Sequence, residues 1–451
     1  MNLRTRKQKF LLKPERLGEI LFILAQYGFR DWIRGIRLHR RIPRISRARE
    51  QHLRDLGRWH NLRRAFEELG PSFMKLGQIL STRSDILPKE LIHELQKLQH
   101  SADPLDWEEL EPLVRKELGG PLEGFFLHVD PQPIASASIA QVHRAVGLNG
   151  TTYALKIQRP GIRTIIEEDL GILQFLAGLA DRYMKEARIF DLQGIVQEFG
   201  KHIQKELSFT QELQNIRRFQ QIMGSNKKIV IPGVVDRLCT DTLLVMEFIQ
   251  GTSVSEILTT KNRNAWNTRE IGRIGAEAIL DMVLIHGFFH ADPHPGNLFV
   301  LSDGSLCLLD FGMTGNLSSR EQRYIIEMLL GMLDRDVERV TRALLAIIPH
   351  PDGTITPELL SQDLEELINQ YLDLPLKYIN IGLFIQQTLQ IIRSHQLAIP
   401  SKFLFMGKAI TTVEGVGRQL YPDFNLLSLM GPITKKIAEK QLNPKNLQKK
   451  A

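Results

Sequence analysis

The chain has few cysteines, no long apolar run near its start and few aromatic residues. With only two cysteines in 451 residues, neither a disulfide framework nor a cysteine-based zinc site can be built, and a reducing compartment is expected. The apolar stretch at 20–25 is far shorter than the ~20 residues of a membrane-spanning helix. A signal peptide is not expected, because no small-residue cleavage site follows it. Hydrophobic residues at 43% and charged residues at 24% indicate an ordinary globular protein.

Positive charge is concentrated at the start of the chain. Residues 1–64 carry 18 Lys and Arg against five acidic residues, so the remainder is net negative although the whole chain carries +7. Four apolar residues in this arm have the spacing of one helix face: Leu17, Ile20, Leu21 and Leu24. Such a helix can lie on an anionic membrane or can pack on its own domain, and both alternatives stay open. Nucleic-acid binding is not expected, because no aromatic stacking motif accompanies the charge.

Changes in hydrophobic periodicity divide the chain into segments. These are a basic amphipathic arm (1–60), a helical N-terminal extension (61–125), a segment of short strands with a helical insert (126–250) and a helix-rich C-terminal segment (251–451). Strands are expected at 125–129, 142–148, 151–157, 228–235, 242–248, 298–300 and 307–309. Asn149-Gly150 predicts a tight hairpin turn. Because strands come first and helices later, we expect an α+β fold with two lobes.

The segment His290–Asn297 (HADPHPGN) and the later Asp310-Phe311-Gly312 have the layout of a phosphoryl-transfer site. Asn297 and Asp310 supply the hard oxygen ligands that Mg²⁺ prefers. Asp292 can orient or deprotonate the attacking hydroxyl or water. The two histidines of this segment could instead bind zinc, but prolines break any helix between them, so a metal-hydrolase site is the weaker alternative.

Phosphoryl transfer of the kinase type also needs a strand lysine and a helix glutamate that orients it. Lys156 lies in a strand-like segment upstream of Asp292, and Glu198, Glu206 and Glu212 are candidate partners. Glu206 and Glu212 differ by ~240° around a helix, so only one of them can meet Lys156. Small residues before this strand replace a glycine-rich loop, and alanine makes the loop stiffer than glycine would. The loop residues expected to contact nucleotide are Ala135, Ser136, Ala137, Ser138, Ile139, Ala140, Gln141, Val142 and His143.

Together these motifs resemble the UbiB family of atypical kinases, the AarF-domain or ubiquinone-biosynthesis kinase-like proteins. The resemblance covers about 61–425 and also rests on Lys75-Leu76-Gly77-Gln78, on 81–88, on 135–145 and on 413–416. It implies a protein-kinase-like core with a helical N-terminal extension, and ATP or ADP with Mg²⁺ as cofactors. It also implies that the helix carrying Lys75 and Gln78 folds over the nucleotide site and regulates it.

The family pattern also implies roles for the glutamates. Glu212 then orients Lys156, and Glu206 faces the helix of Lys75 and shares its regulatory role. Ser208 stands where the family pattern has an aspartate, so the charged contact expected from that position is missing. By the same resemblance, the hinge whose backbone reads the adenine edge consists of Met246, Glu247 and Phe248.

The resemblance implies an ATP-dependent kinase or ATPase that supports ubiquinone or a related isoprenoid quinone pathway. Transfer to proteins is not expected, because the helix of Lys75 should block their groove. The sequence shows no C-terminal pair of apolar helices, so peripheral contact with the anionic inner face of the cell membrane, from the cytoplasm, is expected. Quinone-pathway proteins or lipids are the implied partners. Two alternatives stay open: a small-molecule kinase of the choline or aminoglycoside type, and a nucleotide-binding scaffold without turnover.

Overall fold

The chain divides into two compact units. The first comprises 1–211 and 234–247, and the second comprises 212–233 and 248–451. The computed structural model describes residues 13–38, 57–81, 83, 87–98, 102–184, 191–260, 262–349, 356–372, 379–397, 399–430 and 433. Residues 212–233 were expected to belong to the strand segment 126–250, but they group with the C-terminal residues in the second unit.

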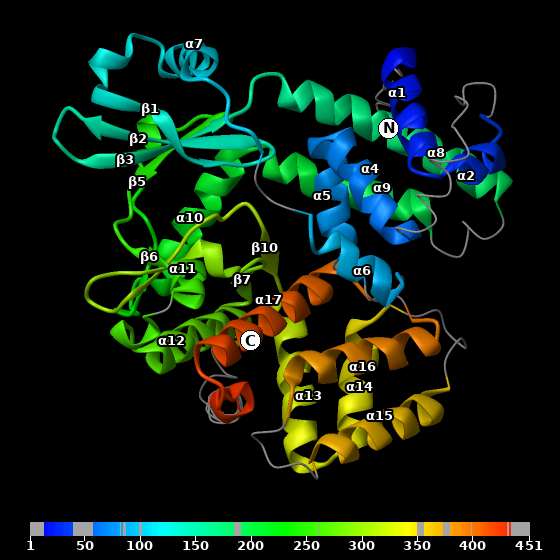
Figure 1. Cartoon of the computed structure of the whole chain (residues 1–451). Coiled ribbons are helices and arrows are strands. Elements are labelled where there is room, and N and C mark those ends of the chain that lie inside the picture. Colours follow the sequence, from blue (N-terminus) through cyan, green and yellow to red (C-terminus); the bar gives the residue numbers. More distant parts are fainter. Residues whose placement is uncertain are drawn as a thin grey trace, which may run out of the picture. The chain divides into compact units, whose positions relative to one another are not determined.

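The first unit contains an antiparallel sheet in the order β1-β2-β3-β5. Its strands are β1 (Phe126–Ser136), β2 (Ala140–Gly147), β3 (Thr152–Gln158) and β5 (Leu243–Glu247). The hairpin predicted at Asn149-Gly150 is confirmed, with Gly150 at a φ of 77°. Helix α7 (Trp107–Leu118) covers the sheet, and its Leu110 belongs to the same apolar core as Phe126 and Leu155 (Figure 1).

Helices form the rest of the first unit, and they confirm the predicted helical extension and insert. They are α1 (Pro14–Gln26), α2 (Arg30–Gly35), α4 (Arg58–Leu69), α5 (Pro71–Leu80), α6 (Lys89–Leu95), α8 (Ile162–Tyr183) and α9 (Leu192–Glu206). All four apolar residues predicted to share a face of α1 are buried, and α1 contacts α4. This face therefore packs on its own unit. Residues 1–12 and 39–56 of the basic arm lie outside the described residues.

The second unit combines small sheets with many helices. One sheet has the order β4-β9-β8-β6 and the other pairs β10 with β7. The strands are β4 (Ile229–Val230), β6 (Thr252–Ser253), β7 (Phe288–His290), β8 (Leu298–Val300), β9 (Leu306–Leu308) and β10 (Thr314–Asn316). Helix α10 (Phe209–Met223) begins in the first unit and continues in the second.

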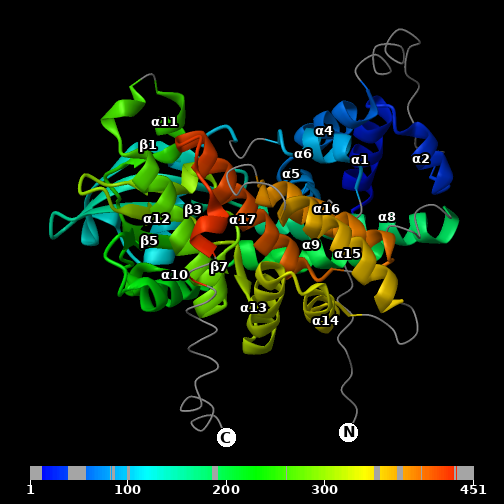
Figure 2. The same cartoon turned by 90° about the horizontal axis from the view of Figure 1, so that it is seen from below.

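The expected helix-rich C-terminal segment is confirmed. Its helices are α11 (Val254–Thr259), α12 (Thr268–Asp281), α13 (Ser319–Asp334), α14 (Val337–Ile347), α15 (Pro357–Leu372), α16 (Ile381–Ser394) and α17 (Ser401–Leu420). Helix α17 packs against α12 and α16 (Figure 2). No helix in the described ranges combines the length and hydropathy needed to cross a lipid bilayer.

Some strand predictions were wrong. The strand expected at 228–235 is reduced to the two residues of β4, and Pro232, which has no N–H to donate, follows it closely. Helical periodicity runs over 268–289 and predicts a helix up to residue 289, but the last two of these residues belong to β7. Gly287 adopts a φ of 63° directly before the strand, which ends the helical turns.

Candidate functional site

The predicted catalytic loop runs from β7 to a 3-10 helical turn at Pro295–Asn297. His290, the buried last residue of β7, accepts a hydrogen bond at Nδ1 from the backbone N–H of Asp292, 3.1 Å away. Its Nε2 therefore carries the proton and donates to the backbone carbonyl of Leu309, also at 3.1 Å. Both ring nitrogens are engaged with the backbone, which argues against a zinc site at His290 and holds Asp292 in place.

The two predicted Mg²⁺ ligands are held close together by the backbone. Asn297 Nδ2 donates to the carbonyl oxygen of Asp292 at 3.3 Å, so its Oδ1 can serve as the metal ligand. The carbonyl oxygen of Asn297 accepts from the N–H of Leu309 at 2.9 Å, and Asp310 follows directly. Among the described residues, no three His, Cys, Asp or Glu side chains gather into a metal site. An amide and a carboxylate oxygen fit a Mg²⁺ ion that phosphate oxygens and water complete.

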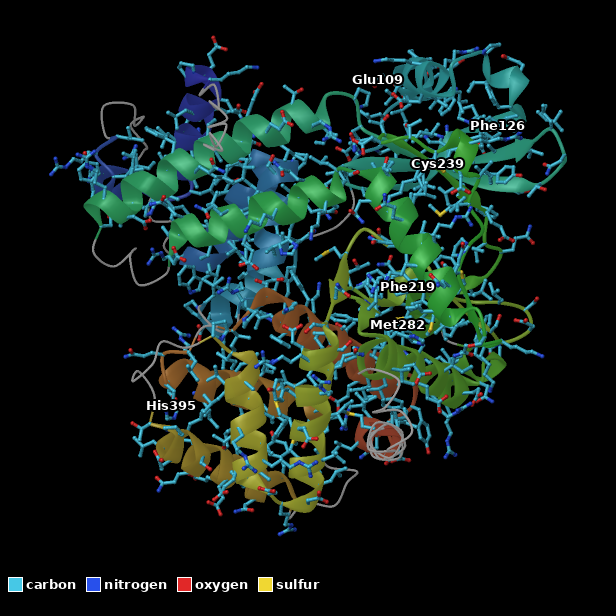
Figure 3. All side chains as sticks on the ribbon, turned by 180° about the vertical axis from the view of Figure 1, so that it is seen from behind. Glu109, Phe126, Phe219, Cys239, Met282 and His395 are labelled. Carbon is cyan, nitrogen blue, oxygen red and sulfur yellow. The ribbon has the colours of Figure 1, made fainter. Side chains whose placement is uncertain are left out.

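Asp310 has an uncommon backbone conformation, with a φ of 58°. Such a conformation costs ~1–2 kcal/mol in a residue other than glycine and is often found at functional sites. The neighbouring residue Phe311 is buried, and its ring centroid lies 5.1 Å from that of Phe219. Phe219 lies on α10 (Figure 3). Asn215 Nδ2 donates to the Phe311 carbonyl at 2.9 Å. Helix α10 therefore stabilises the strained segment that presents Asp310.

A lysine that the sequence motifs did not predict also meets Asp292. Lys408 lies on α17, and its Nζ is 3.0 Å from Asp292 Oδ1. The two residues are 116 positions apart, and no spacing rule links them. Only the fold brings this cation to the predicted catalytic carboxylate.

The alanine-rich segment, residues 135–143, was expected to form a loop, but most of it belongs to strands β1 and β2. Its first residues, Ala135 and Ser136, end β1, and 140–143 begin β2. No positive φ occurs within the described residues 135–143, as expected where glycine is absent. Arg159 Nε donates to the Ala137 carbonyl at 2.9 Å, and its Nη2 donates to Ser136 Oγ at 2.8 Å. The turn at 137–139 is therefore short, and hydrogen bonds from the Arg159 side chain stabilise it.

Two residues expected to contact nucleotide have buried side chains with protein partners. Gln141 Nε2 donates to the Leu105 carbonyl and to His143 Nε2, both at 2.9 Å. Its Oε1 accepts from the Leu105 N–H at 2.9 Å. His143 Nδ1 donates to the Asp130 carbonyl at 2.9 Å, and burial lowers the pKa of His143 below its ordinary value. These side chains stabilise the hairpin, and nucleotide contact by the segment 135–143 stays a prediction.

Lys156 lies in the middle of the sheet of the first unit. It pairs with Val142 of β2 and Leu244 of β5, and its Nζ is 5.4 Å from the ring centroid of Phe209. Glu212 is buried and belongs to the second unit. The predicted contact between Lys156 and Glu212 stays a prediction.

The Lys75 motif lies on α5, where Lys75 forms an ion pair with Glu206 of α9, as expected. Gly77 of the same motif permits close packing, because a Cβ at this position would meet the terminal methyl of the buried Leu98 side chain and displace it. Gln78 lies on the same helix. Ser208, which replaces the family aspartate, donates from Oγ to Asp241 Oδ1 at 2.6 Å. The regulatory role of Lys75, Gln78 and Glu206 stays a prediction.

Two further motif segments have clear positions. Met246 is buried in β5 and Glu247 is its exposed last residue, while Phe248 begins the second unit, so their hinge role stays a prediction. In the 413–416 motif, buried Glu414 accepts from the backbone N–H groups of Ile381 at 3.0 Å and Gly382 at 2.7 Å. It thus stabilises the N-terminus of α16.

Comparison with known proteins identifies the family of the chain. A family model described as the ABC1 atypical kinase-like domain matches 97–344, and a second, the UbiB helical domain, matches 364–425. A Marinobacter nauticus protein named "Probable protein kinase UbiB" is 33% identical over 402 residues, which is 87% of this chain and 72% of the relative. A Pseudomonas fluorescens protein of the same name is 31% identical over 441 residues, 96% of this chain and 80% of the relative.

A solved structure shows the same fold. It is that of Rv3197 from Mycobacterium tuberculosis in complex with erythromycin, with a TM-score of 0.58 and 24% identity over 78% of this chain and 89% of that one. The predicted kinase-like fold and the predicted family are both confirmed. With its kinase-like domain followed by a UbiB helical domain, the chain belongs to the UbiB family of atypical kinases.

Proposed function

We propose that this protein is an atypical kinase or ATPase that binds Mg²⁺ with an adenine nucleotide. The observation that carries the proposal is the backbone-linked arrangement of Asp292, Asn297 and strained Asp310. Asn297 and Asp310 would hold the ion, which neutralises phosphate charge when bound. Asp292 would orient the nucleophile and accept its proton. Lys156 would contact the phosphates, with Glu212 as its partner.

We further propose a role in ubiquinone or related quinone metabolism, with peripheral contact at the inner face of the membrane. Membership of the UbiB family supports this pathway. Because the apolar face of α1 is buried, the Lys and Arg residues of the basic arm, rather than that face, would contact anionic lipid. Quinone-pathway proteins or lipids are the proposed partners.

The test is ATP hydrolysis by the purified full chain with Mg²⁺, with and without anionic liposomes. Asp292→Asn is expected to lower turnover by about a hundredfold or more, because the proton acceptor is lost. Asp303→Asn, a change of the same chemistry in an exposed turn of the second unit, is the matched control. Undiminished turnover in Asp292→Asn would contradict the proposal. Nucleotide binding without turnover in the unchanged chain would favour the scaffold alternative.

A further inference from the structure

We propose that a groove between α11 and α17 of the second unit binds the phosphoryl acceptor, a neutral molecule with an apolar body and a free hydroxyl group. This inference rests on the proposed phosphoryl-transfer function. It adds the class of acceptor and the residues that bind it.

The groove has a volume of about 460 Å³ and borders the catalytic loop. Its lining includes His294 and Pro295 from the loop, Leu258 from α11, and Thr411, Thr412 and Gly415 from α17. Among the described lining residues there is no Asp, Glu, Lys or Arg. Burying a charge without a partner is costly, so such a lining selects neutral ligands. The threonine hydroxyls can hydrogen-bond to hydroxyl groups of the ligand, and the apolar side chains can contact its body.

Helix α17 connects this groove with the catalytic carboxylate. Lys408 precedes Thr411 and Thr412 by three and four residues, so the three side chains share one face of the helix. The Nζ atom of Lys408 lies 3.0 Å from Asp292 Oδ1. The catalytic loop, 290–297, contains no Lys or Arg, so α17 supplies the cation at this position. An ammonium group has three donors and can therefore keep its contact with Asp292 while it donates to a phosphoryl oxygen.

In the proposed step, the acceptor hydroxyl oxygen forms a bond to the γ-phosphorus of ATP. The bond from this phosphorus to the bridging oxygen breaks, and ADP leaves with the electron pair. The hydroxyl proton passes to Asp292, and Lys408 stabilises the negative charge of the transferred group. The products are ADP and a phosphorylated alcohol.

A glycine in the groove permits a sharp test. A Cβ at Gly415 would meet no atom within 4 Å, so Gly415→Leu narrows the groove without a clash at Cβ, and leucine is a better helix former. Gly178 of α8, in the first unit, also has no atom within 4 Å of an added Cβ. Gly178→Leu is therefore the matched control.

The probe is n-octyl β-D-glucoside below its micelle-forming concentration, a neutral molecule with hydroxyl groups and an apolar chain. Calorimetry on the full chain is expected to show binding, weakened by about tenfold or more in Gly415→Leu and unchanged in Gly178→Leu. No binding to the unchanged chain, or equal binding by Gly415→Leu, would overturn the proposal.

Lys408 is tested by mass spectrometry of the phosphorylated probe formed from Mg²⁺ and ATP. Lys408→Ala is expected to lower its rate of formation by about a hundredfold while the probe still binds, and Lys408→Arg is expected to restore part of the rate. An unchanged rate in Lys408→Ala would overturn the role of Lys408. Nucleotide binding is measured on the same samples. Probe binding without nucleotide binding would contradict the proposed function alone, whereas ATP turnover without probe binding would contradict the groove alone.

Discussion

Among single residues, Gln141 shows how a buried amide can stabilise the hairpin of β1 and β2. Its side chain satisfies both backbone groups of Leu105 and one nitrogen of His143, and it also accepts from Ser136 Oγ at 3.3 Å. Buried polar groups that lose a partner cost ~1–3 kcal/mol each. The hydrogen bonds of the Gln141 side chain thus stabilise the conformation of the turn at 137–139. A glycine-rich loop would instead rely on the wide range of φ and ψ that glycine can adopt.

We predict that Gln141→Leu lowers the free energy of unfolding by ~2–4 kcal/mol, because several buried groups lose their partner. Chemical denaturation followed by circular dichroism measures this change. The matched control is Gln132→Leu at an exposed position of β1, which is expected to change it by less than ~0.5 kcal/mol. Equal effects of the two variants would contradict the structural role of Gln141.

At the scale of elements, α1 is fixed by a buried ion pair. Arg16 Nε lies 2.8 Å from Oδ1 of Asp169 on α8, and the side chain of Asp169 is fully buried. Arg16 Nη2 donates to the backbone carbonyl of Leu69 on α4 at 2.8 Å. Burial works to lower the pKa of Arg16, but hydrogen bonds with Asp169 and Glu19 raise it above its ordinary value. One side chain therefore joins three helices of the first unit.

Arg16→Met is predicted to lower the free energy of unfolding by ~3–5 kcal/mol, because the buried carboxylate of Asp169 loses its partner. Arg34→Met removes an exposed arginine whose pair with Asp31 spans 3.3 Å, and it should cost less than ~1 kcal/mol. The double variant Arg16→Met with Asp169→Leu should recover much of the loss, because no buried charge then remains unpaired. Equal melting temperatures for Arg16→Met and Arg34→Met in thermal denaturation would contradict the stabilising role of the pair between Arg16 and Asp169.

Helix periodicity and local motifs predicted the helical extension, the hairpin at Asn149-Gly150 and the catalytic loop. These features depend on residues close together in the chain. Sequence reasoning missed β7, because a run of only three residues, Phe288-Phe289-His290, carries no periodicity of its own. It also placed the alanine-rich segment in a loop, because small residues do not reveal strand pairing. The contact of Lys408 with Asp292 depends on the tertiary fold and left no local signal.

At the scale of the whole molecule, the predicted site residues are divided between two units. Lys156 and the ion pair of Lys75 with Glu206 belong to the first, whereas Asp292 and Asp310 belong to the second. The kinase-like match at 97–344 draws on both units, and the UbiB helical match at 364–425 lies wholly in the second. That helical region includes α17, which brings Lys408 to the catalytic loop. The helical domain therefore places a cation beside the predicted catalytic carboxylate.

Calorimetric binding of ADP to the full chain, with Mg²⁺ and after its removal by chelation, tests the central claim most directly. Mg²⁺ is predicted to tighten ADP binding by about tenfold or more, because Asn297 and Asp310 would hold the ion and the ion would neutralise phosphate charge. Asp310→Asn should abolish this tightening, since asparagine tolerates the same positive φ but lacks the charge. Equal affinity with and without Mg²⁺, or an unchanged effect of Mg²⁺ in Asp310→Asn, would contradict the account.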